Sequence, residues 1–252
     1  MAKTKATETA EAMEITEATE TAEQPQEVVT EVGGVQEILS YDIGSYLYRT
    51  DLEARIYYLD DAVTEYTFRE VTMLIAKANR DDIGLEVSER LPIKLIINTP
   101  GGSVLDGLAL IDAIQTSTTP VIGIVMGTCF SMGLPIICSC PVRLAMPNST
   151  FLFHDGFTGL SDSSNKFMDA VSFYLKIDKK VNKIIADNSN LTMKKLEKIK
   201  RAENYWFAKK AKKLGIIDYI IGEDIDLGSI LGAGAIETSD GCDCDKCHCE
   251  DS

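Results

Sequence analysis

The fold is decided by residues 94–126, KLIINTPGGSVLDGLALIDAIQTSTTPVIGIVM. The stretch opens with a short apolar run at 94–98, turns at two glycines, and continues with apolar residues at helical spacing over 104–115. A second, almost wholly apolar run follows at 121–126. Runs of this kind are typical of parallel strands that are buried on both faces of a sheet. The stretch therefore predicts a strand–helix–strand unit of a parallel sheet covered by helices.

The same alternation of short apolar runs and helical patterns extends from about residue 41 to residue 221. Further strand-type runs lie at 55–59, 151–154 and 216–221, and helical spacing appears at 67–78, 165–188 and 207–214. We therefore predict one α/β domain over residues 39–231, long enough to bury an active site. Its longest helix is expected at 165–188.

The two ends of the chain differ from this domain in composition. Residues 1–38 are predicted to form a disordered acidic extension, and residues 232–252 an acidic, cysteine-rich tail outside the core. Residues 1–31 carry eight Glu against two Lys, and residues 237–252 carry six acids against one Lys, so most of the formal charge of -14 belongs to the ends. The core is close to neutral and has no basic stripe, which argues against nucleic-acid binding.

No segment has the composition of a membrane span or of a targeting sequence. The most apolar runs are broken within about eight residues, whereas a span needs roughly 20. The N-terminal segment lacks the basic start and apolar run of a secretory signal, and it is too acidic for a transit peptide. We therefore expect a cytoplasmic protein without membrane contact, in which the seven cysteines are reduced thiols or metal ligands.

Two consecutive glycines, Gly101 and Gly102, lie between the strand at 94–98 and the helix at 104–115. Glycine permits unusual φ angles and close approach, so backbone N–H groups at this turn can point at an anion or a polarised carbonyl oxygen. A purely structural turn is the more common use of an isolated Gly-Gly pair. The glycine pair therefore indicates a functional site only together with the neighbouring motifs.

Ser131 follows the next buried strand and is expected at the opening of another helix. A serine on such a turn exposes its Oγ at the carboxyl end of the sheet, as in a nucleophile elbow. The N–H of Met132 then faces the same point as the N–H groups of the glycine turn. The structural alternative is that Ser131 caps the helix.

His154 ends the apolar run 151–153 and is the only histidine in the folded region. A lone histidine is more often a structural side chain than a catalyst, but a Ser-His mechanism requires one and the core supplies no other. If the chain order is Ser, His, acid, the third group is an acid or an amide later in the sequence.

Four short motifs, in order, resemble those of the proteolytic subunits of Clp protease. Residues 41–43 (YDI) resemble the family's Y-D-I, and residues 96–104 resemble its I-N-S-P-G-G-S-V with Thr99 in place of Ser. Residues 131–133 match its S-M-G, and residues 145–149 (AMPNS) resemble its A-L-P-N-S, followed at the same interval by His154. The resemblance covers the chain from about residue 41 to residue 221.

This resemblance implies a crotonase-like α/β fold of repeated ββα units, in which the helix at 165–188 protrudes as a handle joining two rings of seven subunits. It implies a serine endopeptidase that cleaves proteins or peptides inside the homo-oligomeric chamber through an acyl-enzyme, with no cofactor. An AAA+ unfoldase is the implied partner. Carried over by position, Ser131 is the nucleophile, His154 is the general base, and the N–H groups of Gly101, Gly102 and Met132 form the oxyanion hole.

The sequence departs from the family pattern at three places. The family's triad aspartate lies shortly before a helix ending in G-L-I-D, and counting back from residues 215–218 places Glu203, one methylene longer, at that position. Asp178, in the handle, is the weaker substitute. The bulky Phe130 precedes the nucleophile and is expected to change the substrate groove. The family's axial loop, which meets the unfoldase, is not recognisable in residues 27–40.

Two other functions fit parts of the sequence. A catalytically silent ring subunit would keep the fold while Glu203 or Phe130 misplaces the imidazole or closes the groove. A viral-type head-maturation protease acting without an unfoldase would fit the altered N-terminus. A crotonase-type acyl-CoA enzyme is disfavoured by the Ser-Met-Gly and His motifs.

The C-terminal tail brings four thiols and an imidazole into eight residues, which are enough donors for a tetrahedral zinc site. An unstructured tail with adventitious metal affinity is the alternative. The donors are Cys242, Cys244, Cys247, His248 and Cys249. Three further cysteines, at 129, 138 and 140, follow the apolar core pattern and are expected to be packing residues.

Overall fold

The computed structural model describes residues 26–32, 35–41, 43–156 and 164–231. The chain divides into two units, Met1–Tyr48 and Arg49–Ser252. Helix α1 (Ile43–Glu53) includes the boundary between them.

The first unit contains an antiparallel hairpin, formed by β1 (Gln26–Val32) and β2 (Val35–Tyr41). A disordered extension was predicted for residues 1–38; residues 26–32 and 35–41 are described as strands, and residues 1–25 and 33–34 lie outside the described part of the chain, so the predicted domain limits stay a prediction. The signal was in the sequence, because two runs rich in β-branched residues flank Gly33-Gly34, a dipeptide typical of hairpin turns.

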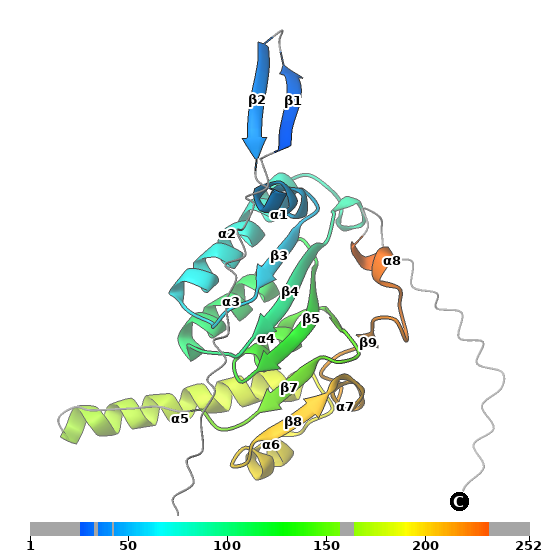
Figure 1. Cartoon of the computed structure of the whole chain (residues 1–252). Coiled ribbons are helices and arrows are strands. Elements are labelled where there is room, and N and C mark those ends of the chain that lie inside the picture. The colour runs from blue at the N-terminus through cyan, green and yellow to red at the C-terminus, as the bar shows by residue number, and fades with distance from the viewer. Residues whose placement is uncertain (1–25, 33–34, 42, 157–163, 232–252) are drawn as a thin grey trace, which may run out of the picture. The chain divides into compact units, whose positions relative to one another are not determined.

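The second unit is built on a seven-stranded, mostly parallel sheet (Figure 1). Five strands lie in the order β3 (Ile56–Leu59), β4 (Ile93–Thr99), β5 (Val121–Phe130), β6 (Val142–Ala145) and β9 (Tyr219–Ile220). The sheet continues from β5 through β7 (Thr150–Phe153) to β8 (Asn204–Phe207), which pairs antiparallel with β7. A mixed α/β fold with a parallel sheet is thus confirmed.

Strand β5 is longer than its sequence pattern indicated, and it has two partners in succession. Its first part pairs with β6, from Ile122 to Val125, and its last part pairs with β7, from Thr128 to Phe130. The expected strand ended at residue 126, because Gly127 and Thr128 interrupt the apolar run. Pairing with β7 extends it to the residue that precedes Ser131.

Helices cover one face of the sheet. The α-helices between β3 and β9 are α2 (Glu65–Asp81), α3 (Val104–Thr116), α4 (Gly133–Ser139), α5 (Ser164–Asp187), α6 (Met193–Ile199) and α7 (Ala208–Lys213). Helices α2, α3 and α4 enclose the larger apolar core with the sheet (Figure 1). This arrangement is the one that the strand–helix–strand unit at 94–126 predicts.

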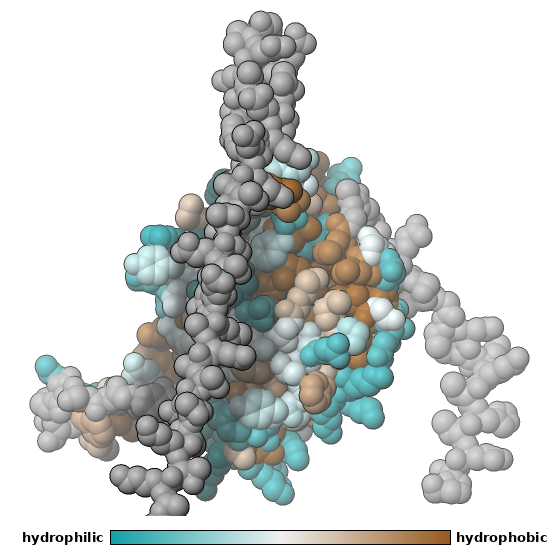
Figure 2. All heavy atoms as spheres, viewed as in Figure 1, coloured by the Kyte–Doolittle hydropathy of each residue, from teal (hydrophilic) through white to brown (hydrophobic). Residues whose placement is uncertain are grey.

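The opposite face of the sheet carries a smaller apolar cluster, which helix α8 (Leu227–Leu231) covers in part. Alternate residues of β4 reach both faces: Ile93, Leu95 and Ile97 belong to the larger core, and Ile96 to the smaller cluster. Figure 2 shows apolar side chains gathered at the surface on this second face, over β4 and β5. The continuous apolar runs of the sequence are explained by burial on both sides.

The long helix predicted at 165–188 is α5 (Ser164–Asp187). Its C-terminal half packs on α4 and α6, with Ile177 and Ile185 buried. Its N-terminal half extends past the sheet (Figure 1) and leaves Phe167, Met168 and Phe173 exposed. Among the described helices, α5 included, none is both long and apolar enough to span a membrane.

Candidate active site

A cavity of about 670 Å³ lies between α4, α5 and the segment that follows β7. Ser131 and His154 both line it, and so does Met132. Its other walls are largely apolar and include Pro135, Phe153, Val171, Ile177, Val181 and Ile185. The structure therefore brings the predicted nucleophile and base to one apolar cavity.

Ser131 occupies a strained turn between β5 and α4. Its φ of 51° lies in the left-handed region, where only one other non-glycine residue of the described chain is found. A hydrogen bond from its N–H to the carbonyl of Leu152 (3.0 Å) holds the turn against β7. Helix α4 begins at Gly133, not at Ser131, and its N-cap is Met132. Ser131 thus does not cap the helix, and the left-handed turn is instead the backbone feature of a nucleophile elbow.

The Gly101-Gly102 turn lies so close to neighbouring parts of the chain that only glycine fits. Gly101 has a φ of 89°, and a Cβ there would lie 2.7 Å from the carbonyl oxygen of Phe130 and 2.7 Å from Ser131 Cβ. Gly102 has a φ of 149°, and a Cβ there would lie 2.4 Å from the carbonyl oxygen of Val63. Close approach of backbone to backbone is therefore the physical reason for both glycines.

The backbone donors of this turn are not equivalent. The N–H of Gly101 donates to Thr99 Oγ1 (3.1 Å), and the N–H of Ser103 donates to the carbonyl of Val63 (2.8 Å). Within the described ranges, the N–H groups of Gly102 and Met132 have no hydrogen-bond acceptor. Gly102 and Met132 are therefore the donors that remain available to an oxyanion, while Gly101 allows the turn to lie against Ser131.

His154 and Glu203 are brought together by the pairing of two strands. The antiparallel register of β7 and β8 runs from Thr150↔Phe207 to Phe153↔Asn204. One step further, it sets His154 opposite Glu203, and His154 Nδ1 lies 3.0 Å from Glu203 Oε1. Cross-strand neighbours of this kind are within direct reach of each other's side chains.

The electrostatics of this pair suit a general base. Hydrogen bonds from His154 and then from Tyr205 hold the pKa of Glu203 below its ordinary value, so the carboxylate is ionised at neutral pH. A carboxylate on Nδ1 assigns the ring proton to that nitrogen and leaves Nε2 as the acceptor. Glu203 is 56% exposed and His154 28% exposed, so the pair lies at the rim of the cavity.

Asp178, the weaker substitute for the acid, has other partners. Lys200 Nζ lies 2.9 Å from Asp178 Oδ2, and Asn182 Nδ2 lies 3.4 Å from Asp178 Oδ1. It lines the cavity without a bond to His154. The carboxylate that contacts the imidazole in this structure is that of Glu203.

Ser131 and His154 share the cavity without a mutual hydrogen bond. The Ser131 hydroxyl makes no side-chain hydrogen bond to any residue that the structure describes. Hydrogen bonds of catalytic groups are often long before substrate binds and shorten in the complex. The lack of this bond is therefore compatible with the predicted roles of Ser131 and His154 as nucleophile and base.

Comparison with known proteins agrees with this geometry. The Clp protease family model matches residues 40–224. The chain belongs to the Clp protease family. Among curated relatives, the ATP-dependent Clp protease proteolytic subunit of Streptococcus mutans is 33% identical over 186 residues, covering 72% of this chain and 90% of the relative. The protein of the same description from Lactococcus lactis subsp. cremoris is 30% identical, with coverage of 72% and 88%.

The chain is therefore a Clp-type peptidase, a hydrolase, and a divergent member of its family.

Phe130, one of the departures from the family pattern, contacts another aromatic side chain in the structure. The Phe130 ring packs edge-on against Tyr205, with ring centroids 5.9 Å apart and an interplanar angle of 82°. Tyr205 was not singled out from the sequence, although its position two residues after Glu203 puts both on the same face of an extended strand.

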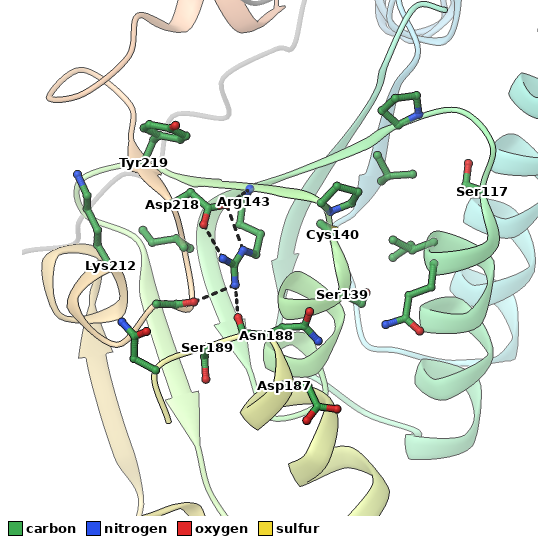
Figure 3. Close-up of a pocket in the computed structure, with 18 of the residues that line it drawn as sticks. Ser117, Ser139, Cys140, Arg143, Asp187, Asn188, Ser189, Lys212, Asp218 and Tyr219 are labelled. Carbon is green, nitrogen blue, oxygen red and sulfur yellow. Dashed lines mark hydrogen bonds and ion pairs between the residues drawn. The ribbon is translucent and has the colours of Figure 1, made fainter. Parts of the chain in front are cut away.

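A second, larger cavity of about 890 Å³ in this Clp protease is lined by Arg143 and its hydrogen-bond partners (Figure 3). Arg143, from β6, donates to the carboxylate of Asp218 and to the carbonyls of Asn188 and Gly215. The guanidinium links β6 to the chain after α5 and to the segment before β9. Its donors are therefore engaged within the chain, and we interpret it as a structural clamp.

The cysteines of the described chain are core residues, as predicted. Cys129, Cys138 and Cys140 are buried, and burial raises the pKa of Cys138 and of Cys140 to about 12. Thiols with such pKa values are poor nucleophiles and poor metal ligands. Among the described residues, no group of three or more potential ligands could hold a metal ion. The predicted zinc ligands of the tail, residues 242–249, lie outside the described residues, and that site stays a prediction.

Proposed function

We propose that the chain is a serine endopeptidase that cleaves peptide bonds through an acyl-enzyme, with Ser131, His154 and Glu203 as its triad. The observation that carries this proposal is the contact of 3.0 Å between His154 and Glu203, made beside the cavity that Ser131 lines. It supports an active enzyme over a silent ring subunit, because the longer acid still reaches the imidazole.

In the first step, Ser131 Oγ attacks the carbonyl carbon of the scissile peptide and transfers its proton to His154 Nε2. The N–H groups of Gly102 and Met132 stabilise the oxyanion, and Glu203 stabilises the imidazolium through Nδ1. His154 then donates that proton to the leaving amine, and the acyl group stays on Oγ. His154 then takes a proton from water, the resulting hydroxide attacks the ester carbon, and His154 returns the proton to Ser131 Oγ as the C–O bond breaks and the acid is released.

We further propose that this chemistry takes place inside a ring-shaped homo-oligomer of two heptameric rings. The exposed apolar residues on the N-terminal half of α5 support this assembly, because such side chains are normally buried against a partner. The relatives' description as proteolytic subunits of an ATP-dependent protease supports an AAA+ unfoldase as the partner that feeds protein substrates.

The direct test is labelling of the purified full-length protein with a fluorophosphonate probe, followed by peptide mass spectrometry. The expected result is one label per chain, on Ser131, because only a serine activated by a base reacts at a useful rate with such probes. Absence of labelling in the assembled protein would support the silent-subunit alternative. A label on another serine would move the nucleophile.

Removing the acid is expected to slow the enzyme without abolishing it. In Glu203→Ala, kcat for a fluorogenic peptide is expected to fall by about 100-fold, less than the roughly 10⁴-fold seen for deeply buried triad acids, because Glu203 is half exposed. Glu197→Ala, on α6, is the control because this carboxylate pairs with Lys200 instead of His154. Full activity of Glu203→Ala would remove Glu203 from the triad.

A further inference from the structure

Tyr205 lies in line with the nucleophile strand and the acid. Strand register pairs Phe130 of β5 with Leu152 of β7, and Leu152 with Tyr205 of β8. Residues paired in this way across neighbouring strands direct their side chains to the same face of the sheet. Tyr205 therefore lies on the same face of the sheet as Phe130. Glu203, two residues before Tyr205 in the sequence, points to that face as well.

The side chain of Tyr205 makes two contacts on this face. Its hydroxyl donates to Glu203 Oε2 (3.0 Å), while Glu203 Oε1 faces His154 Nδ1. Its ring packs edge-on against Phe130. The hydrogen bond to Glu203 is also the main cause that raises the pKa of Tyr205, so the hydroxyl keeps its proton and donates at neutral pH. The two oxygens of the carboxylate are thus held from two sides.

A glutamate at this position needs such support. It has one more rotatable bond than an aspartate, and its side chain is 56% exposed, so water competes for the carboxylate and little packing holds it. A second hydrogen bond from a ring anchored on a strand removes much of this freedom. Tyr205 is 61% exposed, and its aromatic contact with Phe130 favours one orientation of the ring, since edge-to-face pairs have a preferred geometry.

We propose that Tyr205 is a positioning residue, whose hydroxyl holds the Glu203 carboxylate against His154 and whose ring is anchored by Phe130. The proposal rests on the triad of the proposed function. Phe130 was predicted to change the substrate groove; in this arrangement it supports Tyr205 and, through it, the Glu203 carboxylate.

The kinetic test compares Tyr205→Phe in two backgrounds. In the otherwise unchanged protein, we expect kcat for a fluorogenic peptide to fall about three- to tenfold, the effect of losing one solvent-exposed hydrogen bond, with KM changed less than twofold. In the Glu203→Ala background, the same substitution is expected to change kcat less than twofold, because Tyr205 acts through the carboxylate. Tyr66→Phe, at an exposed site on α2, is the matched control and should leave both constants unchanged.

Two kinetic results would overturn the proposal. Unchanged kcat in Tyr205→Phe would show that the hydroxyl is dispensable. An equal loss with and without Glu203 would show that Tyr205 acts on the substrate or on packing. Because phenylalanine keeps the ring on Phe130, an unchanged unfolding midpoint is expected and separates positioning from stability.

A crystal structure of Tyr205→Phe tests the same inference without any activity. We expect the Glu203 carboxylate to leave His154 Nδ1 or to occupy several rotamers. A carboxylate that stays at 3.0 Å from Nδ1 in one conformer would refute the positioning role. If fluorophosphonate labelling of the unchanged protein failed while this displacement was seen, the proposed peptidase chemistry would be wrong and the positioning of Glu203 by Tyr205 would stand.

Discussion

Replacing Ser131 with alanine is expected to lower kcat for peptide cleavage by about 10⁴-fold or more, since Ser131 Oγ is the atom that we propose forms the acyl-enzyme. Stopped assays with a fluorogenic peptide and active-site labelling would measure the loss. KM is expected to change little, because Oγ contributes to bond making more than to substrate binding. Retention of more than a few per cent of the activity would place the nucleophile elsewhere.

The backbone at Ser131 gives this prediction a control. Its φ of 51° costs a residue with a side chain roughly 1 kcal/mol, and glycine avoids that cost. Ser131→Gly should therefore be as inactive as Ser131→Ala, yet more stable than Ser131→Ala by about 1 kcal/mol in urea unfolding. Equal stability of the two variants would argue that the turn is not strained.

Substitution of Gly101 by alanine is expected to lower kcat by about 10³-fold and the free energy of unfolding by about 2–4 kcal/mol. The added methyl would lie 2.7 Å from Ser131 Cβ and 2.9 Å from the backbone nitrogen of Met132. It would therefore displace both the nucleophile and a proposed oxyanion donor. Labelling rates and urea unfolding of the same preparation separate the two effects.

Gly84 is a closely matched control for Gly101. Its φ of 88° is almost that of Gly101, at 89°, but a Cβ there meets no atom within 4 Å. Gly84→Ala should lose only the conformational part, about 1 kcal/mol, and keep full activity. If both variants lost the same activity, the contact between the glycine turn and Ser131 would not be its cause.

Some elements could be predicted from the sequence because burial leaves a local pattern. Strands β4 and β5 show continuous apolar runs, since side chains on both faces enter apolar clusters. Helix α5 shows its spacing over 24 residues. Strand β8 leaves almost no such pattern, because its four residues alternate between half-buried and exposed and pair with only one neighbour. Strand β6 was also missed.

The same limit applies at the carboxyl-terminal strand, which was expected at 216–221. Ile216 and Ile217 are buried and apolar, but the strand covers only Tyr219 and Ile220, the two residues that pair with β6. An apolar run in the sequence indicates that its residues are buried, but it does not indicate their secondary structure. Whether the buried residues form a strand depends on a hydrogen-bonding partner elsewhere in the chain.

The candidate active site shows most clearly which features the sequence determined and which required the tertiary structure. The sequence by itself determined Ser131 and His154 as candidates, because a serine after a buried strand and a single core histidine are local facts, and family position added Glu203. Only the tertiary structure decided that Glu203 instead of Asp178 meets the imidazole, that the N–H groups of Gly102 and Met132 lack an acceptor among the described residues, and that the Tyr205 hydroxyl donates to Glu203. The contact between His154 and Glu203 joins residues 49 positions apart and depends on the register of β7 and β8, which no local pattern encodes.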